Sequence, residues 1–308
     1  MSTITIDIIL IIVCIGGLWL GGNLVVDSAT RIARKIGMSD LIIGLTVVAI
    51  GTSAPEFAVT IGAALQGSSD ISVGNVVGSN IFNLGFILGG LALIRGVATS
   101  RVLVFRDGSV LIGSTILLTI FLWDLTLTRT AGIILIVLLV SYVSYLIFQR
   151  SESEEELTEG EFRWFDSLIF LGGVAIVVGS GHFFVEAASS LARIVGISEW
   201  VIGVTIVAVG TSAPEIATSA IALIRGQHGM SAGNLIGSDL FNLLGVLGLA
   251  AILQPLAVDP AAQTSVFVLV AGVTLVVIMM RTGWKLSRWE GGLLVAITLV
   301  RWIFDFMR

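Results

Sequence analysis

The six residues GTSAPE occur twice in this chain, at Gly51–Glu56 and at Gly210–Glu215, and both copies lie in strongly apolar stretches. The offset of 159 residues (210 − 51) continues downstream, where GNVVGSNIFN (Gly74–Asn83) matches GNLIGSDLFN (Gly233–Asn242) without a gap. A carboxylate in such a setting is costly and marks a functional site with a partner. Two copies of this element predict one site that is built from two repeated halves.

The composition predicts an integral membrane protein of the all-α class. Charged residues make up only 12% of the 308 positions, compared with about 25% in soluble domains. A β-barrel would show an alternating pattern that the solidly apolar run Ile133–Val140 lacks, whereas apolar runs of about 20 residues span a bilayer as helices. Ten such transmembrane helices are predicted, at roughly 5–30, 40–65, 71–94, 102–122, 130–148, 164–192, 199–224, 230–254, 264–281 and 289–306.

The distribution of Lys and Arg predicts the orientation. Loops after odd-numbered spans carry 12 of these residues and the opposite side carries four, so the positive-inside rule places the odd loops in the cytoplasm and both termini outside the cell. Each repeat holds five spans, an odd number, so the second repeat is inverted relative to the first. The expected domains are 1–150, with a motif region at 44–90, and 164–308, with a motif region at 203–249.

A short acidic linker at 151–163 joins the two repeats. It contains six glutamates within Ser151–Glu161 and is predicted to be cytoplasmic. One interpretation is a solvated connector. The other is a funnel that raises the local concentration of cations.

Pro55 and Pro214 predict breaks in the second and seventh spans, at the membrane midplane. A proline has no N–H and clashes with the carbonyl four residues back, which leaves the carbonyls of Gly51 and Gly210 without helical partners. Bare carbonyls at membrane depth are tolerated only where protein or a ligand satisfies them. A simple kink is the alternative interpretation.

Each motif surrounds its glutamate with oxygen ligands. Glu56 and Glu215 have no Lys or Arg in their own spans, so their neutralising charge is expected to be a transported cation or a proton. Oxygen ligands suit Ca²⁺ and Na⁺, whereas transition metals favour Cys or His, and neither histidine lies in a motif. The hydroxyl and amide candidates are Thr52, Ser53, Ser79 and Asn83, and Thr211, Ser212, Ser238 and Asn242. Hydrogen bonding between helices is the alternative for the serines and asparagines at 79, 83, 238 and 242.

Three further features repeat or fail to repeat. Asp27 and Glu186 correspond near helix ends, where a surface ion pair of Asp27 with Arg31 competes with a role on the ion pathway. Asp239 corresponds to Asn80 in the first repeat. Adjacent helical residues point about 100° apart, so Asp239 need not face the site that its neighbour Ser238 shares. Its candidate roles are tuning of cation affinity and proton binding. Glycines at small-xxx-small spacing are expected to let helices approach closely: Gly74, Gly78, Gly233 and Gly237.

These motifs resemble the α-repeats of the sodium/calcium exchanger family, within the cation/calcium exchanger superfamily, and the chain is similar in size to its compact prokaryotic members. The resemblance implies that Glu56 and Glu215 are central carboxylates shared by Ca²⁺ and Na⁺, and that Thr52 and Thr211 bind Ca²⁺ through backbone carbonyls. It implies Na⁺ ligands and flanking residues as follows: Ser53, Ser79, Ser212 and Ser238, the carbonyls of Ala49 and Ala208, and Asn83 and Asn242. It also implies that spans one and six slide past the remaining spans.

The leading hypothesis is therefore a secondary antiporter that exchanges Na⁺ for Ca²⁺ across the cell membrane by alternating access. Relatives that co-transport K⁺ carry Asp at the position of Asn242, so the resemblance implies independence from K⁺, a point that Asp239 leaves open. A Ca²⁺/H⁺ antiporter is the alternative, because glutamates also take protons. A passive channel and an intramembrane enzyme are the other classes; the histidines outside the motifs disfavour an enzyme. The expected partners are Ca²⁺, Na⁺ and the lipid bilayer, with no cofactor, no nucleic acid and no obligatory protein partner.

Overall fold

The computed structural model describes residues 3–148, 164–194 and 208–306. The acidic linker at 151–163 and the first residues of the second motif region, 203–207, lie outside the described residues. The described chain is almost entirely helical, and its short strands lie at helix connections.

The elements of the first half are α1 (Thr3–Ile36), α2 (Asp40–Ile43), the π-helical turn η1 (Gly44–Val48), α3 (Ala49–Thr52), α4 (Ala54–Leu65), α5 (Ser69–Phe82), the π-helical turn η2 (Asn83–Leu88), α6 (Gly89–Arg95), β1 (Val97–Ala98), the π-helical turn η3 (Leu103–Asp107), α7 (Gly108–Phe121), β2 (Thr126–Leu127) and α8 (Arg129–Phe148). The elements of the second half are α9 (Asp166–Ile194), α11 (Ala208–Thr211), α12 (Ala213–Ile224), α13 (His228–Leu240), the π-helical turn η6 (Phe241–Val246), α14 (Leu247–Leu253), β3 (Leu256–Ala257), α15 (Ala261–Arg281), the 3₁₀ turn η7 (Thr282–Trp284), β4 (Lys285–Leu286) and α16 (Arg288–Phe306).

Seven helices of the described part are long and apolar enough to cross a membrane, and all seven coincide with predicted spans. The bent pair Asp40–Thr52 and Ala54–Leu65 makes an eighth if it is counted as one span. The predicted span 199–224 corresponds, as far as it is described, to α11 and the 12-residue helix α12, and the predicted span 289–306 corresponds to α16. The all-α membrane class is thus confirmed, while the number of ten spans stays a prediction.

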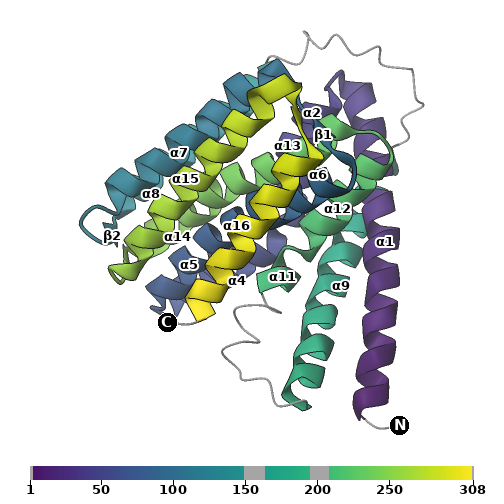
Figure 1. Ribbon diagram of the computed structural model, residues 1–308, viewed down its shortest axis with the longest axis horizontal. Coiled ribbons are helices and arrows are strands. Elements are labelled where there is room, and N and C mark those ends of the chain that lie inside the picture. The colour runs from purple at the N-terminus through teal and green to yellow at the C-terminus, as the bar shows by residue number, and fades with distance from the viewer. Residues whose placement is uncertain (1–2, 149–163, 195–207, 307–308) are drawn as a thin grey trace.

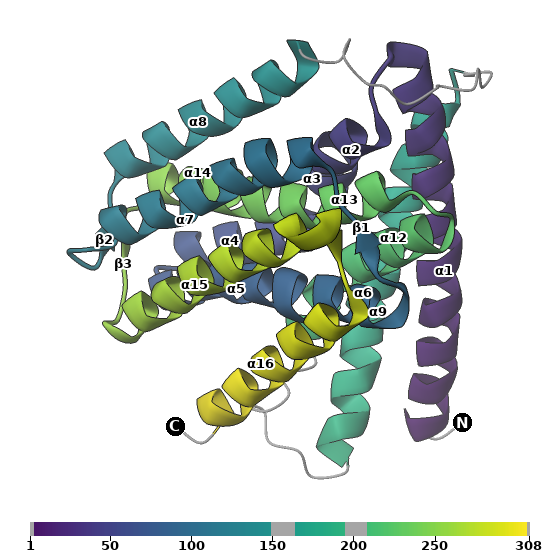
Figure 2. The same ribbon diagram turned by 45° about the horizontal axis from the view of Figure 1, so that its top comes forward.

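Helices α1 and α9 lie side by side and run in a different direction from the other long helices (Figures 1 and 2). Glycines allow the two backbones to approach: a Cβ built on Gly21 would lie 2.9 Å from the carbonyl oxygen of Gly173, and one on Gly173 would lie 3.1 Å from that of Gly21. Small residues at such contacts are a common way for transmembrane helices to associate. The pair therefore packs as one unit beside the remaining bundle.

Two short strand pairs connect the halves. Strand β1 pairs with β4 and β2 pairs with β3, both antiparallel, and in Figure 2 β2 and β3 lie at the far end of α7 from β1. At the repeat offset of 159 residues, β1 of the first half is equivalent to β3 of the second, and β2 is equivalent to β4. The pair Val97–Leu286 is therefore equivalent to the pair Leu256–Leu127, with the two halves exchanged. Exchanged contacts of this kind are typical of an approximate two-fold relation.

Both predicted helix breaks are present. Ser53 separates α3 from α4 with φ −77° and ψ 13°, and Ser212 separates α11 from α12 with φ −87° and ψ 9°. Pro55 and Pro214 then occupy the first turn of the following helix, where the missing N–H removes no intrahelical hydrogen bond. The axis bends by 51° at the first break.

The motif glycines of the second half hold α13 close to the residues that precede α3. A Cβ on Gly233 would lie 2.8 Å from the carbonyl oxygen of Leu41, and one on Gly237 would lie 2.6 Å from the Cα of Leu45. The predicted close approach is confirmed for these two glycines. The equivalent partners for the first-half glycines, at 200 and 204 by the same offset, lie outside the described residues.

Candidate functional site

Glu56 and Glu215 lie in the first turns of α4 and α12, directly after the two breaks. Both side chains are fully buried. The first turn of a helix has unpaired N–H groups and a partial positive charge, which stabilise a nearby carboxylate. The break in each helix thus creates the environment that makes a buried glutamate tolerable.

Each glutamate is bound by a serine from the other half. Ser53 Oγ donates to Glu215 Oε1, and Ser212 Oγ donates to Glu56 Oε1, both at 3.2 Å. All four residues are fully buried. The two copies of GTSAPE therefore meet in one place, and the break residue of one helix contacts the carboxylate of the other.

Thr52 and Ser238 extend this contact toward a backbone carbonyl. Ser238 Oγ donates to Glu215 Oε1 at 3.3 Å and to the carbonyl oxygen of Ala49 at 3.5 Å. Thr52 Oγ1 donates to the same carbonyl at 3.3 Å and lies 3.4 Å from Ser238 Oγ. The structure thus brings these four predicted residues together.

The equivalent residues of the other half are Ser79, Thr211 and Ala208. Ser79 and Thr211 are buried. Ala208 begins α11, and its side chain is outside the described part of the chain. Their grouping around Glu56 therefore stays a prediction.

The asparagines form a second cluster with Asp239. Asn83 Nδ2 donates to Asp239 Oδ1 at 3.0 Å, and Asn80 Nδ2 donates to the backbone carbonyl of Asp239 at 3.0 Å. Asn242 Nδ2 donates to Asn80 Oδ1 at 3.4 Å. Asp239 also interacts electrostatically with Glu215. Helical geometry left the direction of Asp239 open, and the structure turns it toward the other site residues.

Five buried acceptor atoms in these two clusters have no hydrogen-bond partner in the structure. They are Glu56 Oε2, Glu215 Oε2, Asn83 Oδ1, Asn242 Oδ1 and Asp239 Oδ2. Buried polar atoms are almost always paired, and leaving a charged one unpaired is very costly. Since all five are acceptors, the group that satisfies each of them is a cation or a donor hydrogen.

The chemistry of the available ligand atoms also limits which cation fits. Among the described residues, no Lys or Arg forms a salt bridge with the three carboxylates, and no group of three or more His, Cys, Asp or Glu side chains is arranged to hold a metal. The available ligands are carboxylate, hydroxyl, amide and carbonyl oxygens. This set suits Ca²⁺ and Na⁺ better than transition metals.

The sequence analysis missed two asparagines beside the site, Asn75 and Asn234. Asn234 Nδ2 donates to Thr218 Oγ1 at 3.0 Å, while its Oδ1 accepts from Thr52 Oγ1 at 3.2 Å. Asn234 Nδ2 also donates to Ser219 Oγ at 2.9 Å, and Asn75 Nδ2 donates to the equivalent residue of the first half, Thr60, at 3.0 Å. Both asparagines occupy the same repeat position, so the duplication itself was the signal that could have identified them.

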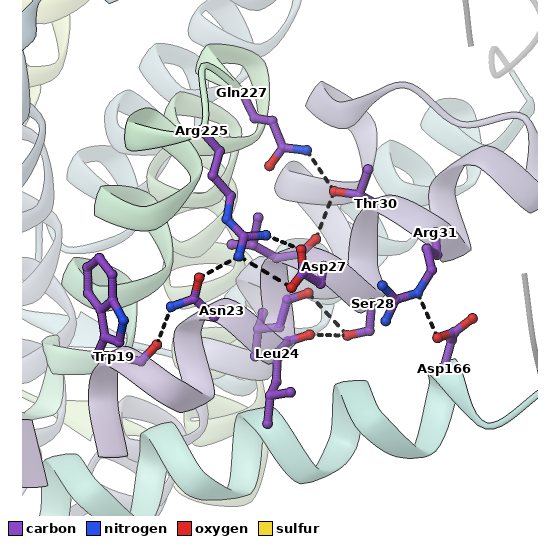
Figure 3. Close-up of polar contacts among 12 residues, drawn as sticks. Trp19, Asn23, Leu24, Asp27, Ser28, Thr30, Arg31, Asp166, Arg225 and Gln227 are labelled. Atoms are coloured by element: carbon purple, nitrogen blue, oxygen red, sulfur yellow. Dashed lines mark hydrogen bonds and ion pairs between the residues drawn. The ribbon is translucent and has the colours of Figure 1, made fainter. Parts of the chain in front are cut away.

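A polar cluster on α1 corrects one predicted ion pair (Figure 3). Asp27 does not pair with Arg31: Asp27 and Asn23 both bind the guanidinium of Arg225, which follows α12. Arg31 instead pairs with Asp166 at the start of α9, with 2.7 Å between Nε and Oδ1. A pair four residues apart on one helix contributes only about 0.2–0.5 kcal/mol, so partners on adjacent elements compete readily.

Comparison with known proteins decides the family. The sequence pattern of the family described as "Sodium/calcium exchanger protein" matches residues 6–148 and 166–304. The chain belongs to the sodium/calcium exchanger family. It is 33% identical to the sodium/calcium exchanger MaX1 of Methanosarcina acetivorans, over 95% of this chain and 96% of that protein. It is 35% identical to the putative antiporter CaxA of Alkalimonas amylolytica, over 88% of this chain and 89% of that protein.

Solved structures agree with this assignment. The fold is similar to that of the sodium-calcium exchanger NCX_Mj soaked with zero Na⁺ and Ca²⁺, with a TM-score of 0.86, 28% identity and coverage of 99% of this chain and 100% of that chain. The predicted family is thus confirmed. As a member of this exchanger family with several apolar helices, the chain is a multi-pass membrane protein.

Proposed function

We propose that this protein is a secondary antiporter that exchanges Na⁺ for Ca²⁺ across the cell membrane by alternating access, independently of K⁺. The observation that carries the proposal is the pair of buried glutamates, each bound by a serine of the other half and each with an unpartnered Oε2. Membership in the sodium/calcium exchanger family and the similarity to NCX_Mj support it.

In this proposal Glu56 and Glu215 bind both cations, and Thr52 and Thr211 bind Ca²⁺ through backbone carbonyls. The Na⁺ ligands and flanking residues are Ser53, Ser79, Ser212 and Ser238, the carbonyls of Ala49 and Ala208, and Asn83 and Asn242. The hydrogen bonds of Ser53, Ser212 and Ser238 to the glutamates support these roles, because an oxygen that already lies beside a carboxylate can share its cation.

Charge explains why transport would be an exchange. A site without an ion carries buried carboxylates that no Lys or Arg of the described residues neutralises, and an uncompensated charge in a low-dielectric interior is strongly unfavourable. Passage through a closed intermediate would therefore be favoured only when Ca²⁺ or Na⁺ is bound. Each ion must then leave on one side and be replaced before the site returns.

We further propose ten spans in two inverted five-helix repeats, 1–150 and 164–308, joined by the cytoplasmic linker 151–163, with both termini outside. The exchanged strand pairs and the exchanged serine–glutamate contacts support a two-fold relation between the halves. An axis in the membrane plane would place the two breaks and the site at the midplane. The unit of α1 and α9 would be the part that moves relative to the bundle.

Proteoliposomes test the function directly. Vesicles loaded with Na⁺ and diluted into Na⁺-free buffer should take up radioactive Ca²⁺, whereas vesicles loaded with N-methyl-D-glucamine should not, and external K⁺ should leave the rate unchanged. A rate of Ca²⁺ uptake that does not depend on Na⁺ but increases with an imposed pH gradient would contradict the proposal and favour a Ca²⁺/H⁺ antiporter. A Ca²⁺ conductance far above transporter turnover would indicate a channel.

A further inference from the structure

Asn234 joins three helices beside the site. It is buried on α13, and its Oδ1 accepts a hydrogen bond of 3.2 Å from the hydroxyl of Thr52, at the end of α3. Its Nδ2 donates to Thr218 Oγ1 at 3.0 Å and to Ser219 Oγ at 2.9 Å, both on α12. The oxygen and both amide hydrogens of Asn234 are therefore in use, and this side chain connects Thr52 to the helix that carries Glu215.

The orientation of this amide is set by Thr218. Thr218 Oγ1 donates its only hydrogen to the carbonyl oxygen of Pro214 at 2.8 Å. Toward Asn234 the same hydroxyl can then act only as an acceptor, so Nδ2 must face Thr218 and Oδ1 must face Thr52. If the amide were turned over, two acceptor oxygens would lie against each other.

The first half lacks this orienting hydroxyl. Asn75 is equivalent to Asn234 at the repeat offset, and Val59, which has no hydroxyl, is equivalent to Thr218. Asn75 is half-buried, and its Nδ2 donates to Thr60 Oγ1 at 3.0 Å. The fixed amide is thus a feature of the second half, although the asparagine itself is repeated.

The contact with Asn234 determines how Thr52 is held. Thr52 is the last residue of α3, directly before the break at Ser53. Its hydroxyl hydrogen has two carbonyl oxygens within reach, that of Asn234 at 3.2 Å and that of Ala49 at 3.3 Å. The bond to Ala49 stays within α3, whereas the bond to Asn234 ties the end of this helix to the second half of the chain.

We propose that Asn234 is a positioning residue for Ca²⁺ that acts through Thr52. It holds this residue, and with it the backbone carbonyl proposed as a Ca²⁺ ligand, at a fixed position relative to Glu215. The inference rests on the proposed function, in which Thr52 binds Ca²⁺ but is not a ligand of Na⁺. Both ends of the Asn234 amide are already hydrogen-bonded within the protein, so its role does not require contact with the ion.

Equilibrium binding of radioactive Ca²⁺ to the purified protein in detergent tests this role. In Na⁺-free buffer, Asn234→Ala and Asn234→Leu should each raise the Kd for Ca²⁺ about 2- to 13-fold, the factor that corresponds to one neutral hydrogen bond. Displacement of bound Ca²⁺ by NaCl then gives the affinity for Na⁺, which should change by a smaller factor. Leucine has nearly the shape of asparagine, so the test does not depend on how well the alanine variant folds.

Variants of Thr52 show whether Asn234 acts through this residue. Thr52→Val removes the hydroxyl, so the addition of Asn234→Ala should weaken Ca²⁺ binding no further. Thr52→Ser keeps the hydroxyl, and in that protein Asn234→Ala should raise the Kd by the same factor as in the unmodified protein. Thr218→Val gives the second half the residue of the first and should have a smaller effect than Asn234→Ala, because Ser219 still holds the amide.

Ser231→Ala is the matched control. Ser231 Oγ, also buried on α13, donates to the backbone carbonyl of Ser219 on α12 at 2.9 Å, so the variant removes a hydrogen bond between the same two helices. Since this bond does not involve Thr52, the Kd for Ca²⁺ should stay unchanged.

Four results would overturn the inference: an unchanged Kd in the variants at position 234, equal weakening of Ca²⁺ and Na⁺ binding, a further loss when Asn234→Ala is added to Thr52→Val, or an equal loss in Ser231→Ala. Each of them leaves the proposed function intact, because the unmodified protein still binds Ca²⁺. Absence of Ca²⁺ binding by the unmodified protein would reject the proposed function itself.

Discussion

In the first half Ser53 donates to Glu215, and in the second half Ser212 donates to Glu56, at the same distance of 3.2 Å. The strand pairs repeat this exchange at opposite ends of α7. Equivalent positions of the two halves thus make equivalent contacts across the molecule at the serine–glutamate pairs and at the strand pairs. In the proposed exchange the site accepts the same ions from two sides of the membrane, and equivalent ligands from the two halves suit both directions.

The halves differ where α1 and α9 meet the rest of the chain. Arg225 binds Asp27 on α1 (Figure 3), whereas the residue equivalent to Arg225 is Gln66, and the α9 counterpart of Asp27, Glu186, pairs with His182 on its own helix at 3.5 Å. The comparison teaches that the two-fold relation holds at the buried serine–glutamate contacts and is relaxed at the surface. Four predictions test that contrast.

The largest effect is expected at the glutamates. Glu56→Gln and Glu215→Gln should each lower Na⁺-dependent Ca²⁺ uptake at least about 100-fold, because removing one partner of a buried charge pair costs roughly 3–5 kcal/mol. The two losses should agree within a few-fold when uptake is measured in proteoliposomes. Glu186→Gln, at a side chain that is 61% exposed, is the matched control and should transport normally. Losses that differ more than tenfold would break the equivalence of the halves.

The serines should show the same equivalence with a smaller effect. Ser53→Ala and Ser212→Ala each remove one hydrogen bond to a carboxylate, which contributes about 1.5–3 kcal/mol. The internal Na⁺ concentration for half-maximal Ca²⁺ uptake should rise roughly 10- to 150-fold, the factor that corresponds to this free energy, and by the same factor in both variants. A change in one variant only would show that the exchanged contacts are not equivalent in function.

The motif glycines of the second half test the close contact between α13 and the first half of the chain. Gly237→Ala places a Cβ 2.6 Å from the backbone of Leu45, and overpacking of this kind costs about 1–3 kcal/mol. The midpoint of thermal unfolding in detergent should therefore fall. Gly113→Ala, at an exposed site with no atom within 4 Å of the new Cβ, should leave the midpoint unchanged. An unchanged midpoint in Gly237→Ala would contradict the close approach.

The smallest effect is expected at the surface difference. Arg225→Gln makes the α1 connection resemble that of α9, and because the paired side chains of Arg225 and Asp27 are 32% and 44% exposed, the loss of stability should stay within about 0.2–1 kcal/mol. High salt should reduce the difference from the unmodified protein. A loss of unfolding free energy above about 2 kcal/mol, well beyond the range for exposed pairs, would show that the two-fold relation is broken at a contact that the fold depends on.

Much of the fold and of the central site was predictable because the signals are local. The apolar runs predicted the helices, and Pro55 and Pro214 predicted both breaks. The repeated motif identified Glu56 and Glu215 as candidate site residues. These features depend on bilayer thickness, on the missing N–H of proline and on the cost of a buried charge. None of them requires knowledge of which helices are neighbours.

The remaining contacts could not be predicted because they depend on how the helices pack. Asp27 pairs with Arg225, 198 positions away along the chain, in place of Arg31 on its own helix. Asp239 meets Asn83 from the other half, and the periodicity of its own helix does not reveal this contact. Asn234 supports Thr52 across a similar separation. In each case the partner lies in the other half of the chain.

The central claim is that two repeated halves build one ion site, and equilibrium dialysis with radioactive Ca²⁺ tests it most directly. The unmodified protein in detergent should bind one Ca²⁺ per chain at the shared glutamates, and either Glu56→Gln or Glu215→Gln alone should abolish that binding. If each half held its own ion, each single variant would keep the Ca²⁺ of the other half, and that result would contradict the account.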